Sequence, residues 1–218
     1  YAWGKAEDAL SREHAVLDHS ADGVAGLWSL VGGKLASYRA FAEEAADLIA
    51  PALGVRAACT THSKPLPGGE AKADVDALAA RFRVSPYAVQ RLVTRHGTRA
   101  ETVLAEGDRR GRATVCTTEP VLAAEVLYAV RHEGARTLQD IARRTNLAYG
   151  PCGGAECALP AAVLAGAELG WSAAEVRAQA ADLLRARRKT RIAAIGPSQA
   201  RAEAMVDAAL RSLGGVGL

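Results

Sequence analysis

Apolar residues recur at two different spacings along this chain. Near the start, two short apolar segments, 14–19 and 26–31, flank the turn-forming residues 20–23, which predicts a β-hairpin. From Leu35 to Pro51 apolar positions return every three or four residues, which is the period of an amphipathic helix. Two strands alone are marginally stable in water, so we expect this hairpin either to pack on the helices or to belong to a larger sheet.

Helical spacing dominates the rest of the chain, and capping residues mark several helix starts. Ser85-Pro86 offers an N-cap followed by proline at the first helical position, and Gly97 marks a C-terminal stop. Thr118 predicts another N-cap, and Thr137 with Asp140 predicts a capping box. Further helices are expected over 70–81, 98–106, 120–134, 160–169, 172–189 and 198–213. The polar stretch 108–114 lacks periodicity and is expected to be the main boundary.

Composition agrees with a mainly helical protein. Of the 218 residues, 50% are apolar and 23% are charged, as in globular proteins, while only 5% are aromatic. We therefore expect an aliphatic, alanine-rich core and a fold that is mainly α with a short N-terminal β-hairpin, an α+β fragment. No apolar run approaches the roughly 18–20 residues that span a bilayer, and the start of the chain lacks a secretory pattern, so we predict a cytoplasmic location.

The charge balance does not favour a nucleic-acid partner. The net charge of +3 comes from 27 basic and 24 acidic residues. The segment 85–96 has the length of a DNA-recognition helix but lacks a clear preceding helix-turn partner. The basic run 185–191 falls at the end of a predicted helix, where cations complement the helix dipole, so we expect it to be a solvated face.

The four cysteines are candidates for metal or redox chemistry rather than for disulfides, given a reducing compartment. Cys152 and Cys157 lie in a glycine-rich loop, and Cys116 directly precedes a predicted helix. Loops of this kind let thiolates converge on an iron–sulfur cluster or zinc. Such a site needs four ligands, and Cys59 lies in the other half of the chain. Buried structural thiols therefore remain the alternative.

A second candidate site joins the second predicted strand to the first helix. This diglycine bend consists of Gly32, Gly33, Lys34 and Leu35. Paired glycines allow close backbone approach to a ligand, and a cation beside a helix N-terminus favours an anion or an electron-rich ring edge. A Gly-Gly pair in this position is more often a simple turn. Arg12 could bind a phosphate with its planar guanidinium or pair with a surface carboxylate.

Taken together, these residues resemble a known family. The stretch SREHAVLDHSADGVAGLWSLVGGKLASYRAFAEEAADLI is similar to the last part of the catalytic fold of FAD-dependent glycerol-3-phosphate dehydrogenases. The segment from Cys59 to about Glu106 resembles the helical C-terminal domain of that family. The segment from Cys116 to Cys157 resembles the extra region of the anaerobic-type large subunit, which is similar to bacterioferritin-associated ferredoxin [2Fe-2S] modules. The implied domains are the end of the catalytic fold (1–50), the helical domain (51–110), the [2Fe-2S]-like region (111–165) and C-terminal helices (166–218).

The resemblance implies a flavoenzyme that oxidises sn-glycerol 3-phosphate to dihydroxyacetone phosphate. It implies electron transfer to quinone or electron-transfer subunits, with peripheral association at the inner face of the cell membrane. Arg12 would help to bind the substrate phosphate, and Lys34 would be a catalytic and substrate-binding residue beside the FAD. The backbone of Gly32, Gly33 and Leu35 would line the pyrimidine edge of the flavin. A dianionic phosphate suits a guanidinium, and charge on a reduced flavin suits a nearby cation and amides.

Two departures from the family pattern limit these expectations. The implied [2Fe-2S] ligands are Cys116, Cys152 and Cys157, with Thr118 in the fourth position. A threonine hydroxyl is not ionised near neutral pH, so we expect a degenerate module. The glycine-rich fingerprint for the FAD pyrophosphate does not occur in this sequence. We therefore expect the C-terminal part of a longer enzyme, inactive alone; the alternative is a stand-alone iron–sulfur or electron-transfer adaptor module.

Overall fold

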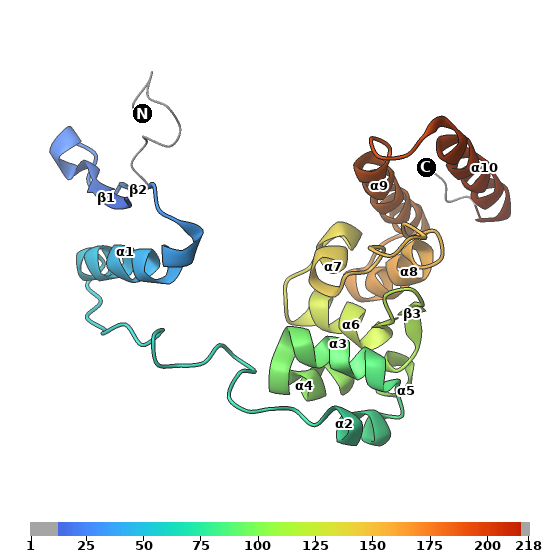
Figure 1. The fold of residues 1–218 in the computed structure, drawn as a ribbon, viewed down its shortest axis with the longest axis horizontal. Coiled ribbons are helices and arrows are strands. Elements are labelled where there is room, and N and C mark those ends of the chain that lie inside the picture. Colours follow the sequence, from blue (N-terminus) through green and yellow to red (C-terminus); the bar gives the residue numbers. More distant parts are fainter. Residues whose placement is uncertain (1–12, 215–218) are drawn as a thin grey trace. The chain divides into compact units, whose positions relative to one another are not determined.

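The computed structural model describes residues 13–214 and confirms a mainly helical chain with a short N-terminal hairpin (Figure 1). It divides into two compact units, Tyr1–Leu66 and Pro67–Leu218. This division differs from the expected boundary at 108–114, because that segment includes α5 (Asp108–Gly111), which packs on α6 (Ala123–Arg131) inside the second unit. The expected family domains remain predictions.

The first unit pairs a hairpin with one helix. Strands β1 (Ala15–Asp18) and β2 (Trp28–Val31) are antiparallel and are joined through the 3₁₀ turn η2 (His19–Asp22). The turn η3 (Leu35–Ser37) then leads into α1 (Tyr38–Ala52). These bounds confirm the predicted hairpin and the predicted helix, which ends close to Pro51.

The hairpin is held on α1 by few contacts. The His14 ring stacks on Phe41 with 4.5 Å between centroids, and His14 Nε2 lies 2.8 Å from Glu44 Oε2. Among the described residues of this unit, Ala45 is the one buried hydrophobic side chain. Large apolar side chains are instead exposed at Leu17, Val24, Leu27, Leu30, Val31, Leu35, Tyr38, Leu48, Leu53, Val55 and Leu66.

The second unit is a compact array of helices. Besides α5 and α6, its elements are α2 (Val75–Phe82), α3 (Pro86–His96), η4 (Gly97–Arg99), α4 (Ala100–Leu104), β3 (Thr114–Cys116), β4 (Val121–Leu122), α7 (Leu138–Thr145), α8 (Ala158–Leu169), α9 (Ala173–Arg191) and α10 (Pro197–Gly214). The Thr137–Asp140 capping box is present as predicted, with Asp140 N–H donating to Thr137 Oγ1 at 3.1 Å. Pro86 begins α3, although Ser85 makes no side-chain cap.

One predicted helix start was wrong. Thr118 does not cap a helix, because it lies in the turn between the two short antiparallel strands β3 and β4. The helix α6 begins at Ala123, where the Glu125 carboxylate accepts a hydrogen bond from Leu122 N–H at 2.8 Å. The intervening turn places the Thr118 side chain near the thiols of Cys116 and Cys152.

The core of the second unit is built around α6, which is buried from Ala123 to Val130. One side of α6 meets α2, α3 and α4, and the other meets α7 and α8, which in turn pack on α9 (Figure 1). Ala161, Ala162 and Ala165 are fully buried, and their small size lets α8 approach its neighbours closely. The expected aliphatic, alanine-rich core is therefore present in this unit.

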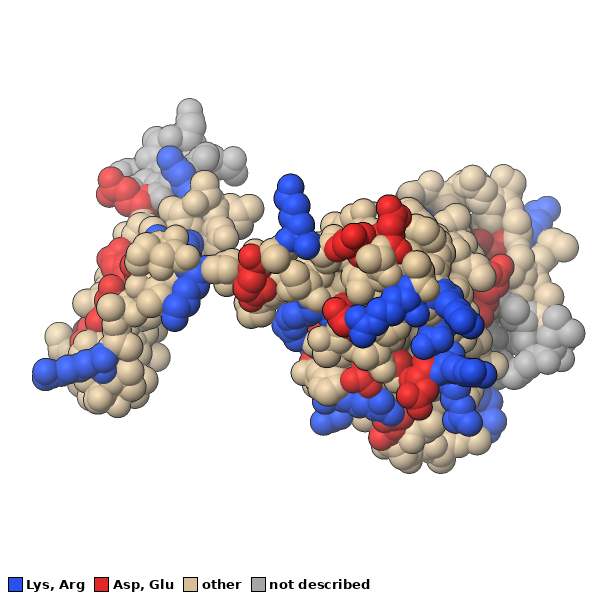
Figure 2. All heavy atoms as spheres, turned by 90° about the horizontal axis from the view of Figure 1, so that it is seen from below, with Lys and Arg blue, Asp and Glu red and all other residues tan. Residues whose placement is uncertain are grey.

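The surface mixes charges of both signs. On the face of the second unit shown in Figure 2, basic and acidic side chains lie next to one another. Arg131, for example, pairs with both Glu106 and Glu168 at 2.7 Å. Over residues 13–214, no helix combines the length and hydropathy needed to cross a bilayer.

Candidate functional site

The diglycine bend takes its shape from the hairpin itself. Gly32 and Gly33 have φ angles of 77° and 95°, in the left-handed region that favours glycine. A Cβ at Gly32 would lie 2.3 Å from the carbonyl oxygen of Glu13, and one at Gly33 would lie 3.4 Å from Phe41 Cδ1. The glycine at position 32 is thus required by the backbone just before β1.

The bend presents a cation beside an exposed apolar group. The Lys34 carbonyl accepts hydrogen bonds from the amide and hydroxyl of Ser37, each at 3.0 Å. Within the described residues, the Lys34 ammonium forms no ion pair or hydrogen bond, and Leu35 is 90% exposed. This combination fits the pyrimidine edge of a flavin, which joins an apolar ring to negative charge in the reduced state. Arg12 lies outside the described residues.

The structure brings the three cysteines of the second unit together with Thr118. We call Cys116, Thr118, Cys152 and Cys157 the thiol cluster. Thr118 Oγ1 lies 3.4 Å from Cys116 Sγ and 3.6 Å from Cys152 Sγ. Cys152 and Cys157 come from the loop between α7 and α8, which approaches Thr118 so closely that a Cβ at Gly150 would lie 2.4 Å from Thr118 Oγ1.

The buried thiols differ in their tendency to ionise. Burial raises the pKa of Cys116, but hydrogen bonds from the Thr118 hydroxyl and the backbone of Glu119 and Ala148 outweigh it, so the net shift is downward. Burial raises the pKa of Cys157 well above its ordinary value, and the neighbouring Cys116 raises it further. Cys116 is therefore more readily ionised than Cys157, although the two thiols are neighbours.

This donor set does not fit a conventional [2Fe-2S] cluster. Such clusters are held by four thiolates or by two thiolates and two imidazoles. Here a hydroxyl occupies the place of one sulfur, and Cys157 resists ionisation. The thiol cluster therefore lacks the full ligand set of such a cluster.

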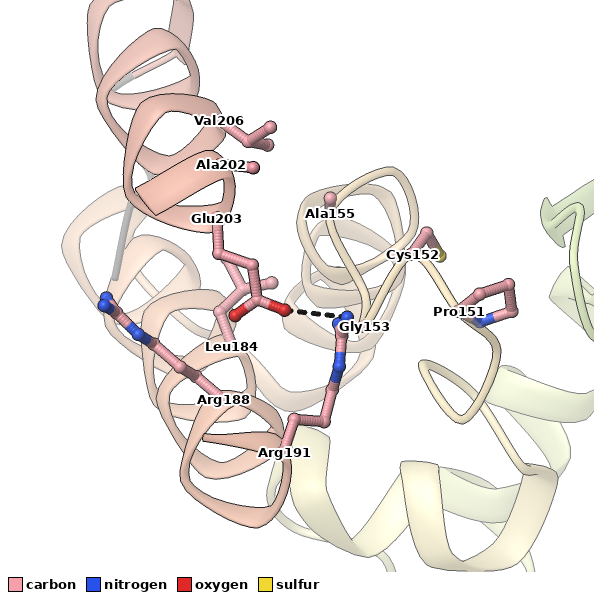
Figure 3. Close-up of a pocket in the computed structure, with 10 residues that line it drawn as sticks. All are labelled: Pro151, Cys152, Gly153, Ala155, Leu184, Arg188, Arg191, Ala202, Glu203 and Val206. Atoms are coloured by element: carbon pink, nitrogen blue, oxygen red, sulfur yellow. Dashed lines mark ion pairs between the residues drawn. The ribbon is translucent and has the colours of Figure 1, made fainter. Parts of the chain in front are cut away.

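A cavity of about 360 Å³ adjoins Cys152, between the glycine-rich loop and helices α9 and α10 (Figure 3). Arg191 and Glu203, which both line this cavity, form an ion pair at 2.7 Å. The Arg187 guanidinium lies 3.9 Å from the centroid of the Tyr149 ring. Part of the basic run 185–191 is therefore engaged within the unit instead of forming only a solvated face.

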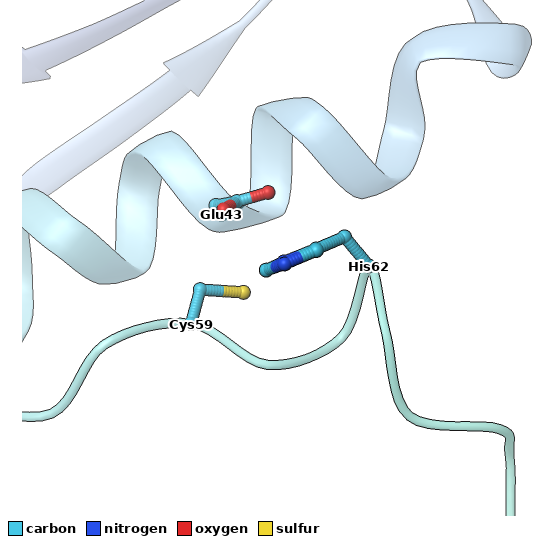
Figure 4. A group of neighbouring side chains, drawn as sticks. All are labelled: Glu43, Cys59 and His62. Carbon is cyan, nitrogen blue, oxygen red and sulfur yellow. The ribbon is translucent and has the colours of Figure 1, made fainter.

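One group of side chains was not anticipated from the sequence. Glu43, Cys59 and His62 lie together in the first unit (Figure 4). The available signal was the spacing Cys-Thr-Thr-His, which places two metal-ligating side chains three residues apart. The many turn-forming residues of this segment had indicated only an irregular loop.

Comparison with known proteins places these features in a family. The chain is 40% identical over 161 residues to a subunit of the anaerobic glycerol-3-phosphate dehydrogenase of Escherichia coli, covering 71% of this chain and 28% of that protein. It is 36% identical over 150 residues to glycerol-3-phosphate dehydrogenase of Synechocystis, covering 66% and 27%. It is 32% identical over 192 residues to glycerol-3-phosphate dehydrogenase 2 of Mycobacterium tuberculosis, covering 83% and 32%.

These three curated relatives are longer than the chain, which spans between about a quarter and a third of their length. The family profile described as the C-terminal domain of alpha-glycerophosphate oxidase matches residues 59–176, more than half of the chain. The match includes the loop with Cys59 and His62 and the whole thiol cluster. The chain therefore belongs to the family of the C-terminal domain of alpha-glycerophosphate oxidase.

Proposed function

We propose that this chain forms the C-terminal part of an FAD-dependent enzyme that oxidises sn-glycerol 3-phosphate to dihydroxyacetone phosphate. The observation that carries the proposal is the diglycine bend, with the Lys34 ammonium unpaired within the described residues and Leu35 90% exposed beside it. The similarity to proteins named glycerol-3-phosphate dehydrogenase supports the choice of substrate.

Each residue at the bend has a distinct task in this proposal. A bound flavin would supply the hydride acceptor for oxidation at C2 of the substrate. The Lys34 ammonium stabilises the negative charge that develops at this edge, and the backbone amides beside it orient the ring. Arg12 binds the phosphate of the substrate with its planar guanidinium, which matches the oxygens of that group.

We further infer that the first unit packs against an FAD-binding part. Its exposed side chains, which include Leu30, Val31 and Leu35, form the kind of apolar surface that proteins usually cover. The chain itself contains no glycine fingerprint for the pyrophosphate of FAD. Electrons would leave through partner subunits to a quinone at the membrane; the relative in Escherichia coli is itself named as a subunit.

The test is a chimera in which this chain replaces the matching part of the Escherichia coli relative. We expect the chimera to purify with a flavin spectrum and to reduce an artificial dye with glycerol 3-phosphate. Lys34→Ala should lower kcat about 100-fold because a cation next to developing charge is lost. Lys64→Ala, an exposed lysine of the same unit, is the matched control and should leave kcat unchanged.

Arg12→Ala in the same chimera should raise KM for glycerol 3-phosphate more than KM for glycerol, because only the first carries a phosphate. A folded chimera without flavin would contradict the proposal. Equal activity of the Lys34→Ala and Lys64→Ala variants would remove Lys34 from the site.

A further inference from the structure

Three potential metal ligands meet in the first unit. Glu43 lies on α1, and Cys59 and His62 lie on the loop that follows it (Figure 4). One carboxylate oxygen, the Cys59 sulfur and one ring nitrogen of His62 lie within 4.8 Å of one another. In Figure 4 the Cys59 sulfur and the His62 ring both lie on the side of the loop that faces α1 and Glu43. We call these three residues the Glu–Cys–His cluster.

The loop is bent so that both of its ligands face one point. The amides of Ser63 and Lys64 donate to the carbonyl of Thr60 at 3.1 Å and 2.9 Å, which closes a tight turn. A turn of this kind brings Cys59 and His62 to the same side. Ligand pairs separated by two residues are typical of zinc sites for this reason.

Neighbouring side chains orient two of the three ligands. Arg39 Nη1 donates to Glu43 Oε2 and, at 3.1 Å, to Thr61 Oγ1. Thr61 Oγ1 lies in turn 3.0 Å from Cys59 Sγ. Hydrogen bonds from outer residues are how proteins hold metal ligands in place.

We propose that the Glu–Cys–His cluster is a zinc site that fastens the loop after α1 to that helix. Thiolate, imidazole and carboxylate ligands together suit Zn²⁺, whereas Mg²⁺ and Ca²⁺ prefer oxygen ligands alone. Tetrahedral zinc holds its donor atoms about 3.5 Å apart, so any pair of donors near the 4.8 Å limit must close by about 1 Å. His62 is exposed and free to make that movement, and water completes the fourth position.

The charges of the cluster suit a divalent cation. As metal ligands, a carboxylate and a thiolate at Glu43 and Cys59 would supply two negative charges, and an imidazole ligand at His62 would add none. Arg39 supplies one positive charge beside them. The surplus of negative charge favours a divalent cation, even with the guanidinium present.

A bound metal would also stabilise the first unit, whose hydrophobic core is small. Ala45 is its one buried hydrophobic residue among those described. Units without a sufficient hydrophobic core commonly depend on a metal or disulfides for stability. Because zinc binds the folded arrangement, its binding free energy stabilises that arrangement. This inference does not rest on the proposed oxidation of glycerol 3-phosphate.

The first experiment measures zinc binding to the purified full chain after removal of metal with EDTA. Titration against a chromogenic zinc chelator should reveal a site that is weakened at least 10-fold in both Cys59→Ser and His62→Ala. Thr60→Ala is the matched control within the same turn, because its side chain is exposed and is not a ligand. Cys152→Ser controls for zinc held by the thiol cluster, and both controls should keep the site.

The second experiment locates the metal. Zinc should protect Cys59 from alkylation by iodoacetamide, as read by peptide mass spectrometry, and this protection should disappear in His62→Ala. Circular dichroism should show that His62→Ala keeps the helix content of the parent chain. Zinc affinity that is unchanged in both ligand variants, or zinc that protects only Cys152, would overturn the proposal.

Discussion

The two units of this chain use their apolar residues in opposite ways. In the second unit, Leu92, Leu138 and Ile141 are fully buried, whereas in the first unit Leu35 and Leu66 are 90% and 83% exposed. The second unit therefore carries its own hydrophobic driving force for folding. The first unit displays apolar surface that gains stability only when another surface or a ligand covers it.

We expect the two units to differ most in the stability lost when one partner of an ion pair is removed. In the second unit Arg91 donates to Glu125 and, at 2.8 Å, to the Thr145 carbonyl, and the Glu125 side chain is only 1% exposed. Arg91→Ala would leave that carboxyl buried without its cation, at a cost of about 3–5 kcal/mol in the free energy of unfolding. Urea denaturation followed by circular dichroism measures this change.

The matched variant in the first unit is Glu44→Ala, which removes the half-exposed contact to His14. It should change stability by no more than about 1 kcal/mol. If Arg91→Ala and Glu44→Ala lowered the free energy of unfolding equally, the burial of an ion pair would not determine its contribution to stability in this chain.

The next contrast compares two apolar truncations. Ile141→Ala deletes a fully buried side chain of α7 and should cost about 2–5 kcal/mol, because it removes packing and leaves a cavity. Leu35→Ala in the first unit should change the stability of the isolated chain by less than about 0.5 kcal/mol. Thermal denaturation of both variants measures the difference. A large loss for Leu35→Ala would mean that this residue is covered in solution.

The smallest expected effect is a pH dependence that originates in the second unit. Burial lowers the pKa of His96, and the nearby cations of Arg95 and Arg91 contribute, bringing it to about 4. An unfolded chain takes up this proton near pH 6.5, so stability is complete above that pH and falls between pH 6.5 and pH 4. Because the ring is partly exposed, we expect a loss of about 1–2 kcal/mol.

Urea denaturation at several pH values between 7 and 4 tests this dependence. His96→Gln cannot take up the proton and should flatten the profile over this range. A parent profile that rises toward acid pH would contradict the downward direction of the pKa.

Local sequence signals were sufficient for most of the helical fold. Pro86 at a first helical position and the Thr137–Asp140 capping box both predicted helices that the structure contains, because caps act within a few residues. The predicted N-cap at Thr118 was wrong because it also rested on neighbouring residues alone. The pairing of β3 with β4 places Thr118 in a turn, and local sequence patterns do not encode such strand pairing.

The candidate sites also differ in how far local sequence could predict them. Lys34 could be singled out because the bend is contiguous in sequence. The approach of Cys116 to Cys152 could only be suggested, since it depends on how β3 and the α7–α8 loop pack. The Glu–Cys–His cluster was missed because Glu43 lies 16 residues before Cys59 and joins it only after the chain turns back along α1.

The contact between the Glu13 carbonyl and Gly32 has a practical consequence for mutational screening. Any side chain at position 32 would collide with the Glu13 carbonyl, just before β1. Substitutions at Gly32 would therefore change both the assembly of the hairpin and the affinity for a ligand. Substitutions of Lys34 should change ligand affinity without changing the assembly of the hairpin, because the neighbouring glycines already set the backbone at this position. A ligand that docks there loses little entropy in organising the polypeptide, which leaves more of its interaction energy for affinity.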